Sequence, residues 1–228
     1  MKLLTVHPVI VFASKEEVHE DELIFTHLET GIGRVNSALS LQRYLSSFDF
    51  GRIIRNIPLI INVGTCGSSI KLDEGTLVAP SRVINSDFSG DLFEAQSISF
   101  NMSILSLLNK EISQFIPDEL HIHDFSKDKD AQKASTIYSA DVFVNKQNFK
   151  ADKYNNIIKE AGFFDMEDAA LAKVCTNFKV PFMSIKVVSD FADIAFDGWE
   201  ERANSLRDKL TAAANSYAQL ISCYFEDF

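Results

Sequence analysis

Polar side chains follow three of the apolar runs in this sequence, and their types suit proton transfer to a small ligand. Glu17, the segment GTCGS at 64–68 and the pair Ser189-Asp190 each come at or shortly after the end of such a run. In open α/β sheets, ligands bind beyond the carboxyl ends of the strands. Carboxylates there exchange protons with a ligand, and glycines let the backbone approach it closely.

Each of the three motifs also has a purely structural interpretation. Ser14 and Glu17 have the spacing of a capping box, and on this motif alone a helix cap is the commoner outcome. The segment 64–68 fits a pair of ordinary tight turns equally well. Ser189-Asp190 fits the N-cap of a following helix equally well.

A fourth candidate comes from helical periodicity. On a helix expected from about Asp165 to Phe178, the apolar stripe extends back by one turn onto Glu167. A carboxylate on a core-facing stripe needs a partner, because an unpaired buried charge is very costly. The helix dipole explains Asp165 and Asp168 better than it explains Glu167. Glu167 is therefore the best functional candidate from the residues alone.

Other motifs favour no cofactor and no metal. The segment 64–68 lacks the Gly-Lys-Ser/Thr ending of a P-loop, and Asn36 stands where a dinucleotide fingerprint needs its third glycine. His121 and His123 could bind a metal together with Asp124, but two histidines without a third placed ligand are more often surface residues. Cys66 has no histidine placed to activate it, so we expect a packed thiol.

Strand-like and helix-like segments alternate along the chain, which predicts an α/β sandwich with a largely parallel sheet. Since 46% of the 228 residues are hydrophobic, we expect one domain over residues 1–228. The expected strands are 9–13, 23–30, 59–63, 76–84, 136–138 and 182–188, the expected helices are 35–45, 98–115, 165–178 and 199–224, and 124–133 is expected to be a surface loop.

Composition excludes several functional classes. The formal net charge of −10 disfavours nucleic-acid binding, since an acidic surface repels phosphates. The longest apolar runs are too short to span a bilayer, and we expect no secretory signal in the first residues, which hold one base and no adequate apolar core. Three widely spaced cysteines suit reduced thiols in a cytoplasmic protein. Six of only nine glycines lie within 31–75, which points to a turn or ligand site there.

Six segments in this order resemble the nucleoside phosphorylase superfamily over nearly the whole chain, and most closely its 5'-methylthioadenosine/S-adenosylhomocysteine nucleosidases. They are EEV at 16–18, GIGRVN at 31–36, NVGTCG at 62–67, SADVFV at 139–144, DME at 165–167 and VSD at 188–190. The resemblance implies a single-domain three-layer sandwich with a central mixed, largely parallel sheet. It also implies hydrolysis of the N-glycosidic bond of adenine nucleosides with release of adenine, a role in methionine salvage, and a homodimer.

The resemblance also implies catalytic roles for three residues. Asp190 matches the general acid that delivers a proton towards purine N7, and Ser189 matches the residue that helps to orient it. Glu17 matches the carboxylate that activates the attacking water. Such an acid works best when its surroundings raise its pKa towards neutrality, and the pair of carboxylates follows the logic of glycoside hydrolysis.

Seven further residues match substrate-binding positions of the family. Glu167 accepts hydrogen bonds from ribose hydroxyls, and Met166 packs on the sugar or base. Phe143 and Val144 bind adenine by stacking and through backbone groups. The remaining three lie beside the ribose and the water (Thr65, Gly67) and beside the 5' substituent (Ile32).

One position separates hydrolysis from phosphorolysis. Phosphorylases of this superfamily carry an Arg for phosphate where this chain has Asn62. Asn62 together with Glu17 favours water as nucleophile. A purine nucleoside phosphorylase, a futalosine hydrolase-like nucleosidase and a non-catalytic nucleoside-binding relative are the alternatives. Departures from the family pattern at Ser14, Ser68 and Lys186, and a short segment after Phe88, leave the 5' group open.

Overall fold

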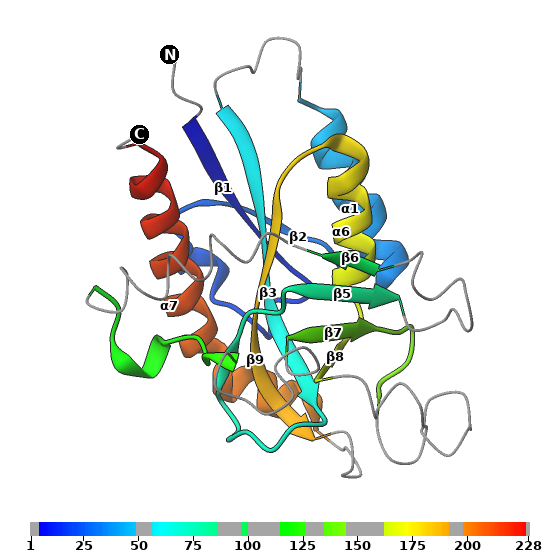
Figure 1. The fold of residues 1–228 in the computed structure, drawn as a ribbon, viewed down its shortest axis with the longest axis vertical. Helices are drawn as coiled ribbons and strands as arrows, with labels where there is room; N and C mark the ends of the chain where they lie inside the picture. Colours follow the sequence, from blue (N-terminus) through cyan, green and yellow to red (C-terminus); the bar gives the residue numbers. More distant parts are fainter. Residues whose placement is uncertain are drawn as a thin grey trace.

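The computed structural model describes residues 5–48, 56–85, 97–99, 115–125, 135–144, 162–191 and 198–226. In these ranges nine strands form one sheet, which runs in the order β2-β1-β3-β8-β7-β5-β6, with β9 paired to β3 and β4 (Figure 1). The strands are β1 (Thr5–Phe12), β2 (Thr26–Glu29), β3 (Asn56–Ser68), β4 (Leu77–Val78), β5 (Arg82–Asn85), β6 (Ser97–Ser99), β7 (Thr136–Ser139), β8 (Phe163–Asp165) and β9 (Phe182–Phe191). The helices are α1 (Arg34–Ser46), α6 (Asp168–Phe178), α7 (Trp199–Glu226) and the short 3-10 turns η1 (Glu20–Glu22) and η2 (Asp118–Leu120).

The sheet is mixed and largely parallel, as expected. Strand β1 pairs in parallel with β2 and β3, β3 with β9, and β7 with β5 and β8. The antiparallel pairs are β3 with β8, β4 with β9, and β5 with β6. Parallel strands send their carboxyl ends to one edge, and this brings segments far apart in sequence together there.

Helices cover both faces of the sheet and make the three layers (Figure 1). Along β1, Val9 and Val11 join the core beneath α1 and α6, whereas Ile10 and Phe12 join the core beneath α7. Because alternate residues of a strand point to opposite faces, a strand buried on both faces is apolar throughout. This explains the continuous apolar runs that the sequence shows.

The structure contradicts the purely structural interpretation of each of the three motifs. Residues 14–18 form a turn and no helix, so Ser14 caps nothing. The segment 64–68 continues β3 and is not a pair of turns. Ser189-Asp190 lies inside β9 and not at a helix N-cap.

Most other elements are confirmed, with shifted ends. Helix α6 starts three residues later than expected, at Asp168, because Asp165 ends β8. The expected helix at 98–115 starts within β6 and lies mostly outside the described residues, as does most of the loop at 124–133. In the described ranges, no helix is both long and apolar enough to cross a bilayer.

Candidate active site

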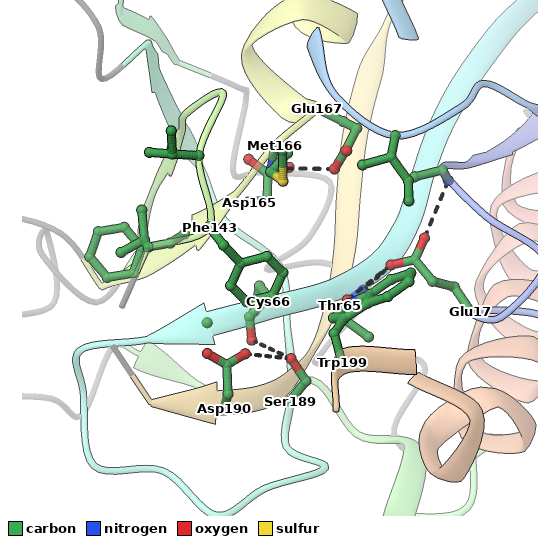
Figure 2. A pocket seen from close by; sticks show the side chains of 16 residues that line it. Glu17, Thr65, Cys66, Phe143, Asp165, Met166, Glu167, Ser189, Asp190 and Trp199 are labelled. Atoms are coloured by element: carbon green, nitrogen blue, oxygen red, sulfur yellow. Dashed lines mark hydrogen bonds between the residues drawn. The ribbon is translucent and has the colours of Figure 1, made fainter. Parts of the chain in front are cut away.

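A cavity of about 280 Å³ lies where several strands end (Figure 2). Its described wall comes from residues at or just after the ends of β1, β3, β7, β8 and β9, from the start of α7 and from the glycine segment before α1. The structure brings all ten predicted site residues together on this wall: Glu17, Ile32, Thr65, Gly67, Phe143, Val144, Met166, Glu167, Ser189 and Asp190.

Glu17 is held by donors from two strands. Its Oε1 accepts hydrogen bonds from the Thr65 backbone N–H at 2.8 Å and from the Thr65 hydroxyl at 3.0 Å. Its Oε2 accepts one from the Ala13 N–H at 3.2 Å. Burial raises the pKa of this carboxyl, while Lys186 and these three hydrogen bonds oppose the rise by favouring the charged form.

Gly64 makes this arrangement possible. A Cβ at this position would lie 2.8 Å from Glu17 Oε1, closer than any side chain allows. Gly67 plays a similar part for Asp190 of β9, because a Cβ added at Gly67 would lie 3.2 Å from Asp190 Oδ2. The two glycines of β3 therefore give room to two acidic side chains.

Asp190 lies at an irregularity of β9. The pairing with β3 steps from Cys66–Val188 to Gly67–Asp190, so Ser189 is an extra residue in the strand. Such bulges re-aim side chains beside active sites. The Ser189 hydroxyl donates to Asp190 Oδ1 at 2.7 Å, and burial raises the pKa of Asp190 although this hydrogen bond and Arg202 lower it.

Glu167 is buried just before α6, at the N-cap position. Its Oε1 accepts the N–H of Gly33 at 2.8 Å, which fixes the carboxyl against the segment before α1. Gly33 has a φ of 90°, a conformation that glycine adopts at little cost. Burial, followed by the charge of Asp165, raises the pKa of Glu167 to about 8, although Lys186 and the Gly33 N–H oppose this.

A buried ion network lies beside the cavity. Lys186 Nζ is 3.1 Å from Asp165 Oδ2 and 3.6 Å from Asp168 Oδ1, and these side chains are at most 2% exposed. Asn62 also donates to Asp168 Oδ1, at 2.5 Å. Asn62 thus binds a carboxylate beneath the site and is not among the described residues of the cavity wall. The acids raise the pKa of Lys186 despite its burial, so it stays charged.

The segment after β7 forms another part of the wall. Phe143 and Val144 face the cavity, and the backbone N–H of Ala140 donates to the Asp165 carbonyl at 3.0 Å. Arg34 Nε donates to Asp141 Oδ1 at 2.8 Å, and this pairing lowers the pKa of Asp141. The pair ties this segment to the start of α1.

Sequence reasoning missed six residues of the wall: Ala13, Cys66, Val142, Phe164, Asp165 and Trp199. Asp165 was assigned to a helix start, where an acid needs no other explanation. Trp199 had one available signal, since it is the single tryptophan of the chain. Cys66 is a packed thiol as expected, and burial raises its pKa well above the usual value.

Among the described residues, no group of three or more His, Cys, Asp or Glu side chains is arranged to hold a metal ion. His121 Nε2 instead lies 3.1 Å from the Ile116 carbonyl, and the ring of His123 packs on Phe125. These contacts fit the structural interpretation of both histidines.

Comparisons with known proteins agree with this picture. The family model of the phosphorylase superfamily matches residues 15–225. A 5'-methylthioadenosine/S-adenosylhomocysteine nucleosidase of Staphylococcus saprophyticus is 28% identical over 213 residues, covering 89% of this chain and 84% of the relative. One from Glaesserella parasuis is 24% identical over 204 residues, covering 88% and 80%.

Solved structures show the same fold. The nucleosidase of Neisseria meningitidis in complex with methylthio-immucillin-A superposes with a TM-score of 0.64 at 19% identity, covering 98% of this chain and all of the other. That of Colwellia psychrerythraea in complex with adenine gives 0.62 at 19% identity, covering 97% and 96%.

Proposed function

The chain belongs to the phosphorylase superfamily, and from that premise we propose that it is an N-glycosyl hydrolase of adenine nucleosides. Its substrates are nucleosides such as 5'-methylthioadenosine and S-adenosylhomocysteine, and adenine is the base released. The curated relatives with this activity cover most of the chain, which supports this choice within the superfamily.

One observation carries the choice of water over phosphate. The described wall of the cavity holds four carboxylates, Glu17, Asp165, Glu167 and Asp190, and no Lys, Arg or His. The nearby Lys186 is engaged by Asp165 and Asp168. A phosphate dianion needs cationic donors, which the described part of this wall does not offer, whereas a water molecule needs none.

In the proposed reaction Asp190 supplies the proton for the leaving base. Cleavage of the bond to adenine places negative charge on the purine, and a proton delivered to N7 neutralises it. Burial raises the pKa of Asp190, so the group retains a proton more readily than an exposed aspartate. The Ser189 hydroxyl at 2.7 Å holds the carboxyl in one orientation.

Glu17 acts on the other reactant. It takes a proton from the attacking water, while its three hydrogen-bond donors keep the carboxylate fixed and favour its ionised form. Glu167 binds the ribose hydroxyls, with Met166 against the sugar. Phe143 and Val144 hold the adenine ring, and Ile32 lies towards the 5' substituent.

The experiment that tests this function is a product assay. The purified protein is incubated with 5'-methylthioadenosine, S-adenosylhomocysteine, futalosine and inosine, with and without phosphate, and the products are separated by chromatography. We expect adenine and a free sugar from the first two, at rates independent of phosphate. Formation of a ribose 1-phosphate would identify a phosphorylase, and binding without turnover would identify a non-catalytic relative.

We also propose that the protein is a homodimer whose second copy covers the rim of the cavity. Val35 and Leu39 are 68% and 60% exposed on one face of α1, and Ile32 and Val142 at the rim are 46% and 41% exposed. Exposed apolar side chains next to a ligand site favour contact with another chain. Leu39→Glu should shift the protein to a monomer in analytical ultracentrifugation and raise KM, and a dimer unaffected by this change would contradict the assignment.

The cellular setting follows from the same chemistry. Release of adenine from 5'-methylthioadenosine is a step of methionine salvage. The three free cysteines suit a reducing compartment, so we propose that the enzyme is cytoplasmic.

A further inference from the structure

Trp199 connects to the water-activating carboxylate through one intermediate residue. Its indole Nε1–H donates to the Thr65 hydroxyl oxygen at 3.1 Å, and that hydroxyl lies 3.0 Å from Glu17 Oε1 (Figure 2). Trp199 lines the cavity at the first residue of α7, more than 130 residues from Thr65 in the chain. The contact therefore depends on the tertiary structure and not on residues that are neighbours in the sequence.

The chemistry of the three groups fixes the direction of the chain of hydrogen bonds. An indole N–H donates and cannot accept, so the Thr65 oxygen accepts from Trp199. The only proton of that hydroxyl is then free to point at Glu17, whose ionised carboxylate accepts and does not donate. Without the indole, the hydroxyl can rotate and donate elsewhere.

The first turn of α7 is held in place by further contacts. Gly198, with a φ of 95°, lets the chain turn into the helix immediately before Trp199. Three residues after Trp199, Arg202 Nη1 donates to the Ser189 carbonyl at 3.1 Å, and this hydrogen bond holds the first turn of α7 against β9. The indole is thus presented to β3 by a fixed element.

We propose that Trp199 is a positioning residue that orients Glu17 through the Thr65 hydroxyl, and that the start of α7 belongs to the catalytic machinery. The kinetic part of this inference rests on the proposed function, in which Glu17 activates water.

A spectroscopic experiment tests the connection without any turnover. Because the chain has one tryptophan, its proton–nitrogen correlation spectrum contains one indole signal. We expect this signal to move upfield in Thr65→Val, to move less but in the same direction in Glu17→Gln, and to stay in Thr65→Ser. Thr26→Val is the matched control, since Thr26 is an exposed residue of β2 that contacts His7. An indole signal unmoved by Thr65→Val would overturn the inference.

Kinetics then test the consequence for Glu17. Trp199→Phe keeps an aromatic ring and removes the N–H, so we expect kcat to fall about fivefold, the usual worth of one neutral hydrogen bond, with KM nearly unchanged. The same change made in a Thr65→Val background should have no further effect. If the losses of kcat in the two single variants multiply in the double variant, Trp199 does not act through Thr65.

The pH dependence gives a second kinetic readout. Loss of a hydrogen bond to the carboxylate should move the acidic limb of the kcat/KM profile to higher pH in Trp199→Phe. The other charges that act at this position, Lys186 and Glu167, are unchanged in the variant. A wild-type protein that hydrolyses no nucleoside would refute the proposed function, and the indole signal would still decide whether Trp199 and Glu17 are coupled.

Discussion

The carboxyl groups of the cavity differ in their neighbours, and this difference supports the roles that we propose for them. Burial raises the pKa of Glu17, but a nearby ammonium and three hydrogen-bond donors oppose this rise by favouring the charged form. Asp190 is held mainly by Ser189 and lies where burial favours the neutral form. Two acids whose environments differ in this way are suited to act as base and acid in one reaction.

Asp190→Asn should abolish most of the activity and leave binding intact. The amide has nearly the same shape but cannot deliver the proton, so we expect kcat to fall by at least about 100-fold. Adenine release measures the rate, and quenching of the single tryptophan on addition of ligand measures binding. A variant with more than a tenth of the wild-type rate would remove Asp190 from the role of general acid.

Lys186→Met should destabilise the protein strongly. Removal of the ammonium leaves Asp165 and Asp168 buried without their cation, which costs about 3–5 kcal/mol in comparable cases. Chemical denaturation measures the free energy of unfolding. Lys173→Met, on the exposed side of α6, is the control and should change this free energy by less than about 0.5 kcal/mol. Equal stabilities of the two variants would show that the buried network is not needed for folding.

Residue types predicted much of this site, but not always for the right reason. Glu167 is buried and lines the cavity, yet it precedes α6 and does not continue the apolar stripe of that helix. Asp165 was explained by a helix dipole, whereas it ends β8 and pairs with Lys186. A sequence does not reveal such pairs, because the partners meet only through the pairing of distant strands.

At the scale of elements, substitution of Gly64 tests the close packing of β3 against the turn that carries Glu17. In Gly64→Ala the new methyl group would displace Glu17 Oε1, so we expect a fold that persists with kcat reduced at least about tenfold. Steady-state kinetics and circular dichroism measure the two effects. Gly75→Ala is the control, because its φ of 85° makes the change costly for stability while Gly75 is not among the described residues of the cavity wall. Full activity of Gly64→Ala would contradict the placement of Glu17.

Elements with a strong apolar period were predictable, and those shaped by the site were not. Strands β1, β3 and β9 were found because burial on both faces requires an apolar run. For the segment that contains Gly64 and Gly67, tight turns and a ligand site were equally favoured, and a continued strand was not expected because glycine usually interrupts a strand. Here β3 continues through Gly64 and Gly67. Glycine weakens a strand, but at these two positions a Cβ would crowd the carboxyl groups of Glu17 and Asp190.

For the whole molecule, buried acids make stability depend on pH. The pKa of Glu167 rises from 4.5 to about 8 on folding, so the native state binds a proton that the unfolded state has lost between these values. Stability is then greatest below pH 4.5 as far as this group is concerned, and it is lost as pH rises towards 8. Glu17, Asp168 and Asp190 act in the same direction.

Glu167→Gln should therefore reduce this dependence. The amide cannot ionise, so the variant should gain stability relative to the wild type as pH rises from about 5 to 8. Thermal unfolding at several pH values provides the measurement. If the difference in Tm between Glu167→Gln and the wild type stays constant over this range, Glu167 is not the group that takes up a proton on folding.

The position of Glu17 and Asp190 against β3 has a further consequence. Glu17 lies against Gly64 and Asp190 against Gly67, three residues along one strand. Since a strand rises about 3.3 Å per residue, its own covalent geometry keeps the two contact points about 10 Å apart. The wall at Ile32 and Val142 is built from other segments and can change without altering that spacing. Such a division lets substrate preference diverge, in evolution or by engineering, while the reaction is conserved.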